Sequence, residues 1–262
     1  IWGGGDLASG VALRLFKTGM RLLIVEVNQP TAVRRSVSFA QAVFDGQTVV
    51  EGVTGQLIHN FSQTNDCRLA GKIPILVDPE LKKVEKYRPL VLIDARMRKK
   101  PAVIPLSIAE MVIGLGPGFE AGENCHAAIE TNRGHFLGRV YWQGSPEANT
   151  GIPGKVGDYS IERVLRAPSD GIIEAFVAIG EQVHQDDLLI TIGDYEIRAP
   201  FNGVLRGLIQ PGLHVKEGMK VGDVDPRPEN YRCWTVSDKA LAIGGGVLEA
   251  ILTKPKICSK LW

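Results

Sequence analysis

A glycine-rich stretch near the start of the chain, Gly3-Gly4-Gly5-Asp6-Leu7-Ala8-Ser9-Gly10, decides the expected fold. Read as the pattern G-x-G-x-x-A, Gly3 would form a tight turn and Gly5 would let the backbone approach a phosphate. Ala8 would then allow a helix to pack closely on a strand. Such a turn needs a strand before it, and only Ile1 and Trp2 precede it, so we expect that a few residues are missing upstream.

The residues after this turn have the periodicity of an amphipathic helix, with Leu7, Val11 and Leu15 on one face. A buried strand is expected over 22–25, and Glu26 follows it where dinucleotide-binding folds place a ribose-binding acid. Asp6 argues against a phosphate site, because its carboxylate could cap the helix at the position where a phosphate would bind. A nucleotide-like ligand at the turn and a purely structural turn are therefore both open. The cofactor-binding candidates here are Gly3, Gly4, Gly5, Asp6 and Glu26.

Composition narrows the class of protein. The 262 residues include 30 basic and 29 acidic ones, a net charge of +1, so no global field attracts nucleic acid or an anionic membrane. The apolar runs are far shorter than a membrane span. Four cysteines are scattered without a C-x-x-C pair, which is typical of reduced cytosolic thiols. We expect a cytoplasmic protein that binds neither nucleic acid nor membrane.

Short strands alternate with helical segments over the first part of the chain, with strands expected at 73–77, 90–93 and 111–113. This alternation predicts a parallel sheet. A stretch rich in Gly, Pro and Asn at 144–157 is the best candidate for a domain boundary. The sequence therefore predicts an α/β, Rossmann-like domain over residues 1–157.

An internal repeat follows this boundary: Ala167-Pro168-Ser169-Asp170-Gly171-Ile172 returns as Ala199-Pro200-Phe201-Asn202-Gly203-Val204. Two similar halves of short strands predict a small all-β domain over 158–226. It resembles the biotinyl/lipoyl-like barrel-sandwich hybrid family. Carriers of that family bear a modified lysine on the hairpin between the halves, but the stretch 192–197 contains none. We therefore expect a structural or docking module without covalent biotin or lipoate.

Basic residues cluster directly after the predicted strand at 90–93. Asp94 ends the strand, and the basic residues Arg96, Arg98, Lys99 and Lys100 follow. This cluster could hold phosphate through charge-assisted hydrogen bonds, or it could be a solvated turn. Arg34 and Arg35 could likewise meet a 2′-phosphate or form a hydrated helix face.

A second glycine-rich turn contains Gly114, Gly116 and Gly118. Nucleophilic, acid-base and anion-binding residue types follow within a short distance: Cys125, His126, Glu130, Arg133 and His135. Such a set could line a reactive pocket, with Cys125 and His126 as catalytic candidates and Arg133 as an anion-binding one. Its spacing matches no established metal site. Cys125 could equally be a small buried hydrophobe.

The segment 227–262 contains three consecutive glycines, Gly244, Gly245 and Gly246, inside a helical pattern. Each glycine costs about 1 kcal/mol relative to alanine in a helix interior. Either they allow a close backbone contact, or they form a turn that opens a new helix toward a ligand. We expect this segment to return to the first domain and to add to its pocket.

Six stretches in order resemble one known family: GGGDLASGVALRL at 3–15, RRSVSFAQAVFDG at 34–46, DARMRKK at 94–100, IGLGPGFEAGENCHAAIETNRGHFLGRVYW at 113–142, NTGIPG at 149–154 and SDKALAIGGGVLEA at 237–250. It is the YqeB family of selenium-dependent molybdenum hydroxylase maturation proteins. IGGGVLEA is also similar to a signature of XdhC-type factors, which handle molybdenum cofactor before its insertion. Trp2 stands where the family usually has a basic residue.

The resemblance implies an accessory factor that binds a phosphate-bearing ligand such as molybdenum cofactor and acts with a molybdenum hydroxylase or its maturation machinery. The pocket would combine both glycine turns, Glu26 and the glycines at 244–246, with Cys125 handling sulfur or selenium. One alternative is an NAD(P)-dependent oxidoreductase, as the stretch from the first glycines to Glu26 suggests. Another is a non-catalytic scaffold that docks a partner enzyme. Whether the chain forms a homo-oligomer is left open.

Overall fold

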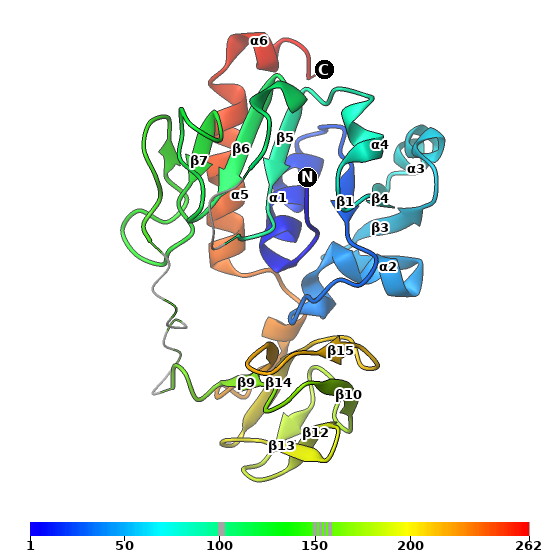
Figure 1. The fold of residues 1–262 in the computed structure, drawn as a ribbon, viewed down its shortest axis with the longest axis vertical. Coiled ribbons are helices and arrows are strands. Elements are labelled where there is room, and N and C mark those ends of the chain that lie inside the picture. Colours follow the sequence, from blue (N-terminus) through cyan, green and yellow to red (C-terminus); the bar gives the residue numbers. More distant parts are fainter. Residues whose placement is uncertain (99–102, 149–150, 152–153, 155, 157–158, 262) are drawn as a thin grey trace. The chain divides into compact units, whose positions relative to one another are not determined.

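The computed structural model describes residues 1–98, 103–148, 151, 154, 156 and 159–261. The chain is mixed α/β, as predicted, and divides into two compact units (Figure 1). Unit 1 comprises Ile1–Pro30, Ser38–Thr150 and Val236–Trp262, and unit 2 comprises Thr31–Val37 and Gly151–Thr235. The C-terminal segment from Val236 onward thus lies in unit 1, whereas 227–235 and the short segment Thr31–Val37 lie in unit 2.

The strands of unit 1 form two four-stranded arrays that the first residues of the chain join into one sheet. One array has the order β1-β4-β3-β2, and the other has the order β5-β6-β7-β8. The bounds are β1 (Ile24–Glu26), β2 (Gln47–Val50), β3 (Val53–Ile58), β4 (Ile73–Val77), β5 (Val91–Asp94), β6 (Met111–Leu115), β7 (Ala127–Ile129) and β8 (Val140–Tyr141). Pairing is parallel except for β2 on β3 and β8 on β7.

Trp2 lies between the two arrays and pairs in parallel with Val25 of β1 and with Asp94 of β5. Its amide donates to the carbonyl of Ile93 at 2.8 Å, and the amide of Gly3 donates to the carbonyl of Val25 at 2.7 Å. The chain therefore runs from a central position to β1 on one side and later to β5 on the other. In open α/β sheets, the carboxyl ends of the strands at such a reversal are where ligands bind.

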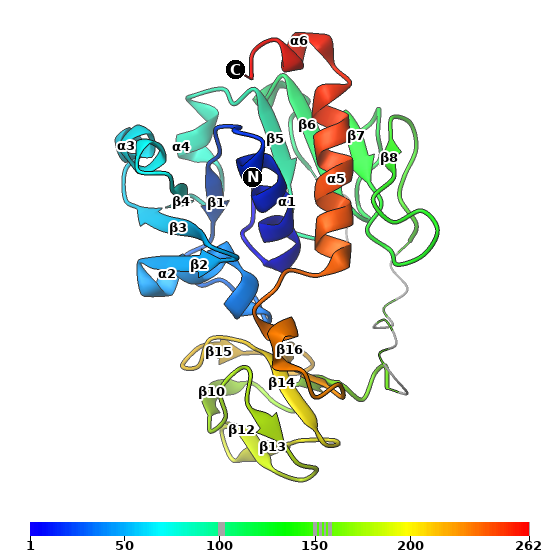
Figure 2. The same ribbon diagram turned by 180° about the vertical axis from the view of Figure 1, so that it is seen from behind.

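Two long helices of unit 1 pack side by side, α1 (Asp6–Lys17) and α5 (Asp238–Leu252) (Figure 2). Small residues bring their backbones together: a Cβ added to Gly10 would lie 2.5 Å from the Cβ of Ala240, and one added to Gly244 would lie 3.0 Å from the carbonyl oxygen of Gly10. The shorter α-helices are α2 (Ala42–Asp45), α3 (Thr64–Leu69), α4 (Lys82–Glu85) and α6 (Pro255–Cys258). The 3-10 helices are η1 (Arg35–Val37), η2 (Phe39–Gln41), η3 (Phe61–Gln63), η4 (Leu106–Ile108) and η5 (Asn230–Cys233).

Alternate residues of the central strands face opposite sides of the sheet. On one side Val25, Leu92 and Val112 join a buried apolar cluster with Leu81 and Val84 from the α4 region. On the other side Ile129 of β7 meets α5, where a Cβ on Gly246 would lie 3.1 Å from it. Both faces are thus covered, which explains why these strands are nearly continuous apolar runs in the sequence. No helix in the described ranges is long and apolar enough to cross a membrane.

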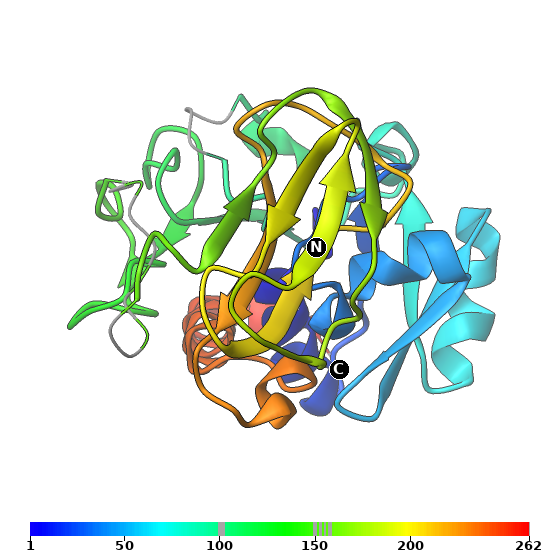
Figure 3. The same ribbon diagram turned by 90° about the horizontal axis from the view of Figure 1, so that it is seen from below.

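Unit 2 consists mainly of short strands (Figure 3), and their starts follow the internal repeat of the sequence. β10, β11 and β12 begin at Gly171, Gln182 and Leu188, and β14, β15 and β16 begin at the matching positions of the second copy, Gly203, His214 and Lys220. The bounds are β9 (Val164–Arg166), β10 (Gly171–Ala175), β11 (Gln182–Val183), β12 (Leu188–Ile192), β13 (Tyr195–Arg198), β14 (Gly203–Leu208), β15 (His214–Val215) and β16 (Lys220–Asp225).

The two halves of unit 2 exchange strands between two four-stranded sheets. One sheet has the order β13-β12-β10-β15, and the other has the order β11-β14-β16-β9. Each sheet therefore combines strands from both copies of the repeat, so neither copy completes a sheet alone. The β12–β13 hairpin turns at Gly193 and Asp194.

The segment Thr31–Val37 is held in unit 2 by hydrogen bonds to main-chain groups. The amide of Leu208 donates to the carbonyl of Val33 at 2.8 Å, and Arg35 Nε donates to the carbonyl of Leu208 at 3.0 Å. Arg34 donates through Nη2 to the carbonyls of Arg232 and Thr235. The sequence-based prediction that Arg34 and Arg35 meet a 2′-phosphate therefore finds no support, because both guanidinium groups anchor this segment.

Alanine substitutions at neighbouring glycines of α5 are predicted to have opposite effects. A Cβ at Gly245 meets nothing within 4 Å, so Gly245→Ala should raise the free energy of unfolding by about 1 kcal/mol through helix propensity. A Cβ at Gly246 would lie 2.1 Å from the carbonyl oxygen of Gly138, so Gly246→Ala should lower it by about 2 kcal/mol. Chemical denaturation measures both, and equal stability of the two variants would contradict the close contact.

Candidate functional site

The Gly3–Gly5 turn connects the central Trp2 position to α1 at the carboxyl edge of the sheet. Gly3 has φ +94, a conformation that residues with a Cβ rarely adopt. Gly4 packs against the backbone of Ala40, whose nitrogen would lie 2.9 Å from an added Cβ. Gly5 is different: a Cβ there would meet nothing within 4 Å. The turn is therefore closed at Gly3 and Gly4 and open at Gly5.

Glu26 ends β1 and binds the glycine turn directly. Its carboxylate accepts a hydrogen bond from the amide of Gly4 at 2.6 Å through Oε2 and another from the amide of Val27 at 2.8 Å through Oε1. Burial raises the pKa of Glu26, while these two amide bonds act in the opposite direction. The predicted ribose-binding acid thus lies beside the turn, where it also fixes the turn's conformation.

The amino end of α1 begins with a glycine. Gly5 occupies the N-cap position before the first turn and forms no side-chain cap hydrogen bond. Asp6 lies in that turn. Its carboxylate therefore lies near the positive end of the helix dipole, which is where the sequence-based interpretation of Asp6 placed its charge.

Arg96 is brought to the turn, but its charge is neutralised there. Its guanidinium group forms a bidentate ion pair with Asp94, with Nε 2.9 Å from Oδ1 and Nη2 2.5 Å from Oδ2. Asp94 is fully buried. Arg96 also stacks over the ring of Trp2, and its Cγ would lie 3.3 Å from a Cβ on Gly3. Arg96 thus stabilises the turn and does not offer a free positive charge. The other members of the predicted basic cluster, Lys99 and Lys100, lie outside the described residues.

The second glycine turn follows β6 at the same edge of the sheet. Gly114 belongs to β6, where an added Cβ would fall into the ring of Phe119. Gly116 and Gly118 have φ +79 and +98, so both turn residues need glycine. A Cβ on Gly116 would lie 2.5 Å from Thr131 Oγ1. These contacts give Gly114 and Gly116 packing roles, since neither has open space beside it.

Polar groups at the end of β7 meet the start of α5 at this edge. Glu130 is fully buried and accepts hydrogen bonds from the amides of Asn132 and Glu147, each at 2.7 Å. Arg133 forms a bidentate pair with Asp238, both distances being 2.7 Å. This hydrogen bond lowers the pKa of Asp238 to about 2. Arg133, predicted to bind an anion, is thus already paired with a carboxylate of this chain.

Lys239 is a candidate that sequence reasoning missed. It follows Asp238 in the first turn of α5, and its electrostatic neighbours include Asp6 of α1 and Glu130 beyond β7. Burial lowers the pKa of its ammonium group. Among the described residues, no hydrogen bond or ion pair joins this ammonium group to a partner. The only sequence signal was its place in the SDKALAIGGGVLEA stretch.

Cys125 and His126 lie at the opposite edge of the sheet, because they precede β7 whereas Glu130 follows it. Cys125 is fully buried in the apolar cluster, and burial raises its pKa to about 11. His126 accepts a hydrogen bond through Nδ1 from the amide of Val112, and burial lowers its pKa. The structure therefore does not support the expected grouping of these two residues with the glycine turns.

The glycines at 244–246 lie inside the continuous helix α5. Gly244 packs on α1 and Gly246 on the Gly138 loop, so the close-contact interpretation of this stretch describes the structure and the new-helix interpretation does not. Neither glycine has space for a ligand. The described residues contain no group of three or more His, Cys, Asp or Glu side chains that could hold a metal ion.

Comparison with known proteins gives one relative of high similarity. The chain is 47% identical over 252 residues to an uncharacterized protein named YqeB from Escherichia coli strain K12. The matched region covers 96% of this chain and 47% of the relative. This match supports a YqeB family. The chain spans about half the length of that relative. No family model matches the chain.

Similar solved structures include the ectoine utilization protein EutE (DoeB) from Ruegeria pomeroyi, a succinylglutamate desuccinylase from a Silicibacter species and an aspartoacylase family protein from Mesorhizobium loti. The identities are 23, 25 and 11%, and the matches cover 32, 32 and 79% of this chain and 27, 27 and 58% of those chains. The TM-scores are 0.24, 0.23 and 0.26. Scores this low carry no argument about fold or activity.

Cys125 is predicted to resist alkylation in the folded protein. Because it is buried with a pKa of about 11, iodoacetamide should modify it about a hundredfold more slowly than in the unfolded chain at mildly alkaline pH. The partly exposed Cys258 should react first and is the internal control. Peptide mass spectrometry follows both sites, and equal rates for the two thiols would restore Cys125 as a candidate nucleophile.

Proposed function

We propose that unit 1 is a Rossmann-like domain that binds a phosphate-bearing ligand beside Gly5, and that the chain serves in this way as an accessory factor for a molybdenum hydroxylase. The observation that carries the proposal is the open side of the turn at Gly5, where the strand order reverses and α1 begins. A ligand phosphate there would meet backbone N–H groups and the positive end of the α1 dipole.

Lys239 supports the same ligand chemistry. A half-buried ammonium group without a direct partner is costly, and an anion beside it would lower that cost. Asp6, Glu130 and Asp238 contribute negative charge to its surroundings, whereas Arg133 contributes positive charge. In the bound state Lys239 would contact the phosphate while Glu26, already fixed by the amide of Gly4, would accept a ligand hydroxyl.

The proposed maturation role rests on the family resemblance of the sequence motifs, since the YqeB relative is itself uncharacterized. Because the chain spans about half the length of that relative, the partners of this chain and any reaction that it catalyses are proposals. A molybdenum hydroxylase, or a factor that equips one, is the proposed partner. The ligand would be molybdenum cofactor or its dinucleotide form, with the phosphate at Gly5.

The second candidate is an NAD(P)-dependent oxidoreductase. Glu26 favours it, because an acid at the end of the strand after the glycine turn is where a nicotinamide dinucleotide places its adenosine ribose. Native mass spectrometry of the purified protein separates the two candidates. A bound pterin supports the maturation role, and a bound nicotinamide dinucleotide supports the oxidoreductase.

Gly5→Val tests the site itself. The side chain would enter open space at a φ of −66°, so the variant should fold normally but block the approach of a phosphate. We expect the small molecule that co-purifies with the native protein to be lost from Gly5→Val and retained by Gly245→Ala, whose new methyl group also meets nothing. Retention by both variants would exclude this turn as the binding site.

Lys239→Met is predicted to weaken binding of ADP-ribose, used as a phosphate-bearing probe, by at least tenfold, since a charged hydrogen bond contributes about 1.5–3 kcal/mol. Lys17→Met, on the exposed end of α1, is the matched control and should bind normally. Affinity in the native protein should fall as the pH rises through the lowered pKa of Lys239, because the neutral amine no longer attracts phosphate. Calorimetric titration measures both effects. Unchanged affinity and pH dependence in Lys239→Met would remove this lysine from the site.

A further inference from the structure

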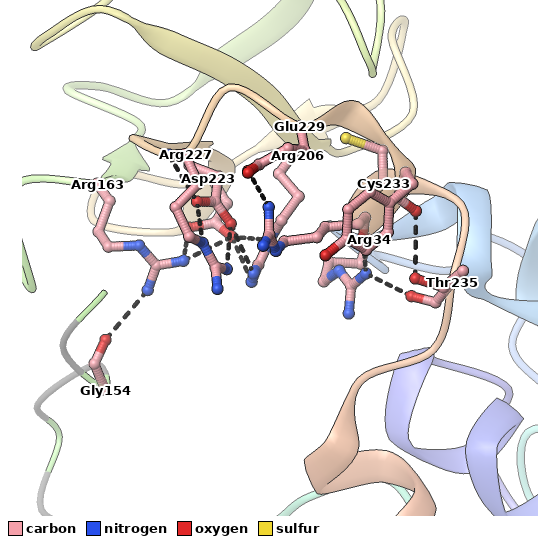
Figure 4. Close-up of polar contacts among 12 residues, drawn as sticks. Arg34, Gly154, Arg163, Arg206, Asp223, Arg227, Glu229, Cys233 and Thr235 are labelled. Carbon is pink, nitrogen blue, oxygen red and sulfur yellow. Dashed lines mark hydrogen bonds and ion pairs between the residues drawn. The ribbon is translucent and has the colours of Figure 1, made fainter. Parts of the chain in front are cut away.

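Unit 2 contains a cluster of ionised side chains at the carboxyl end of β16. Asp223 and Asp225 of this strand are 1% and 2% exposed. Three arginines surround them: Arg163 precedes β9, Arg206 lies on β14, and Arg227 follows β16. Figure 4 shows their guanidinium groups side by side around Asp223. We call these five residues the arginine cluster.

The contacts in the arginine cluster are close. Arg163 Nη2 lies 2.8 and 3.0 Å from the two oxygens of Asp223. Arg206 bridges both acids through all three nitrogens, with Nε 3.0 Å and Nη2 2.8 Å from Asp223 Oδ2 and Nη1 3.1 Å from Asp225 Oδ2. Arg227 binds Asp225 through Nε at 2.8 Å and Nη2 at 2.7 Å. The two carboxylates are thus shared among three guanidinium groups.

The arginine cluster carries more positive than negative charge. Three guanidinium charges face two carboxylates, an excess of one. Arg163 is 5% exposed, and its Nε has no hydrogen-bond partner in the described part of the chain. Burial lowers the pKa of Arg163, Asp223 and Asp225 act in the opposite direction, and Arg206 and Arg227 lower it further. An additional anion would offset this repulsion.

The internal repeat shows that the strands do not require this chemistry. At the matching positions of the first copy, Arg206, Asp223, Asp225 and Arg227 correspond to Glu174, Thr191, Gly193 and Tyr195. The first copy therefore builds β10, β12 and the start of β13 without an arginine at any of these positions. Buried ion pairs often contribute little net stability, so their presence in one copy alone points to a role beyond folding.

Donors remain for a ligand on the more exposed arginines. The side chain of Arg206 is 18% exposed and that of Arg227 is 40% exposed. Each guanidinium group has more N–H donors than its contacts with the aspartates use. The two acids hold these groups in fixed positions, so a ligand would lose little side-chain entropy on binding.

We propose that the arginine cluster is a binding site for the phosphate group of a small molecule. The free N–H groups of Arg206 and Arg227 donate to the phosphate oxygens, and the buried charge of Arg163 adds to the attraction. A tetrahedral group with several acceptor oxygens suits donors that come from separate guanidinium groups, whereas the planar bidentate edges already hold carboxylates. This site is separate from the turn at Gly5 and does not depend on the function proposed for unit 1.

The test is a titration of the full-length chain with inorganic phosphate, followed through the arginine Nε–Hε signals in ¹H–¹⁵N NMR spectra. The signals of Arg206 and Arg227, assigned by their loss in Arg206→Lys and Arg227→Lys, should shift saturably. Arg198, which pairs with Glu196 on β13, should not respond. Equal shifts for all three arginines, or the same shifts with sodium chloride at matched ionic strength, would overturn the proposal.

Three variants make the result specific. Arg227→Met removes a half-exposed side chain and should weaken phosphate binding at least tenfold, while Arg198→Met should leave it unchanged. Gly5→Val should also leave it unchanged. Loss of the response in Gly5→Val and its retention in Arg227→Met would place phosphate in unit 1 and refute this site. A response to polyglutamate but not to phosphate would refute it as well, in favour of an acidic protein partner.

Discussion

The architecture of unit 1 depends on the main-chain hydrogen bonds of Trp2 and Gly3. The amide of Trp2 binds the carbonyl of Ile93, and the amide of Gly3 binds the carbonyl of Val25. Each such bond contributes only about 1 kcal/mol net, but together they join two strand arrays into one sheet. They also fix where the strand order reverses, and so they determine that the glycine turn and the start of α1 lie at the carboxyl edge.

Much of this arrangement could be predicted because it rests on local patterns. The apolar run at 73–77 coincides with β4, the i, i+4 face after the turn forms α1, and the internal repeat reappears in the strand starts of unit 2. These features come from periodicity and turn residues, which act over a few positions. The strand-like pairing of Trp2 directly before the turn also agrees with the glycine pattern.

Glycines show why the candidate site was harder to predict. Gly3 is required by its φ, Gly5 borders open space, and Gly244 and Gly246 allow backbone contact between segments far apart in the chain. The sequence shows the same residue in each case, whereas the distinction depends on the tertiary neighbour. The expectation that all the glycine stretches line one pocket was wrong for Gly244 and Gly246 because helix packing occupies the space beside them.

Cys125 and Lys239 illustrate the same limit in opposite ways. Cys125 and His126 closely precede Glu130 in sequence, but β7 stands between them, and about 3.3 Å per residue carries the chain to the other edge of the sheet. Lys239 and Asp6 lie near opposite ends of the sequence, but the packing of α5 on α1 makes the two electrostatic neighbours. Similarly, Arg34 and Arg35 follow β1 in sequence but anchor their segment in unit 2.

We propose that an anion binds beside the open turn at Gly5 and pairs with Lys239, which is an electrostatic neighbour of Asp6 in the first turn of α1. A crystal structure of the protein with ADP-ribose tests it most directly. We expect phosphate density within hydrogen-bonding distance of the amides that open α1 and of Lys239 Nζ, with Glu26 still bound to the amide of Gly4. Density for the ligand elsewhere, with the turn at Gly5 left to solvent, would contradict it.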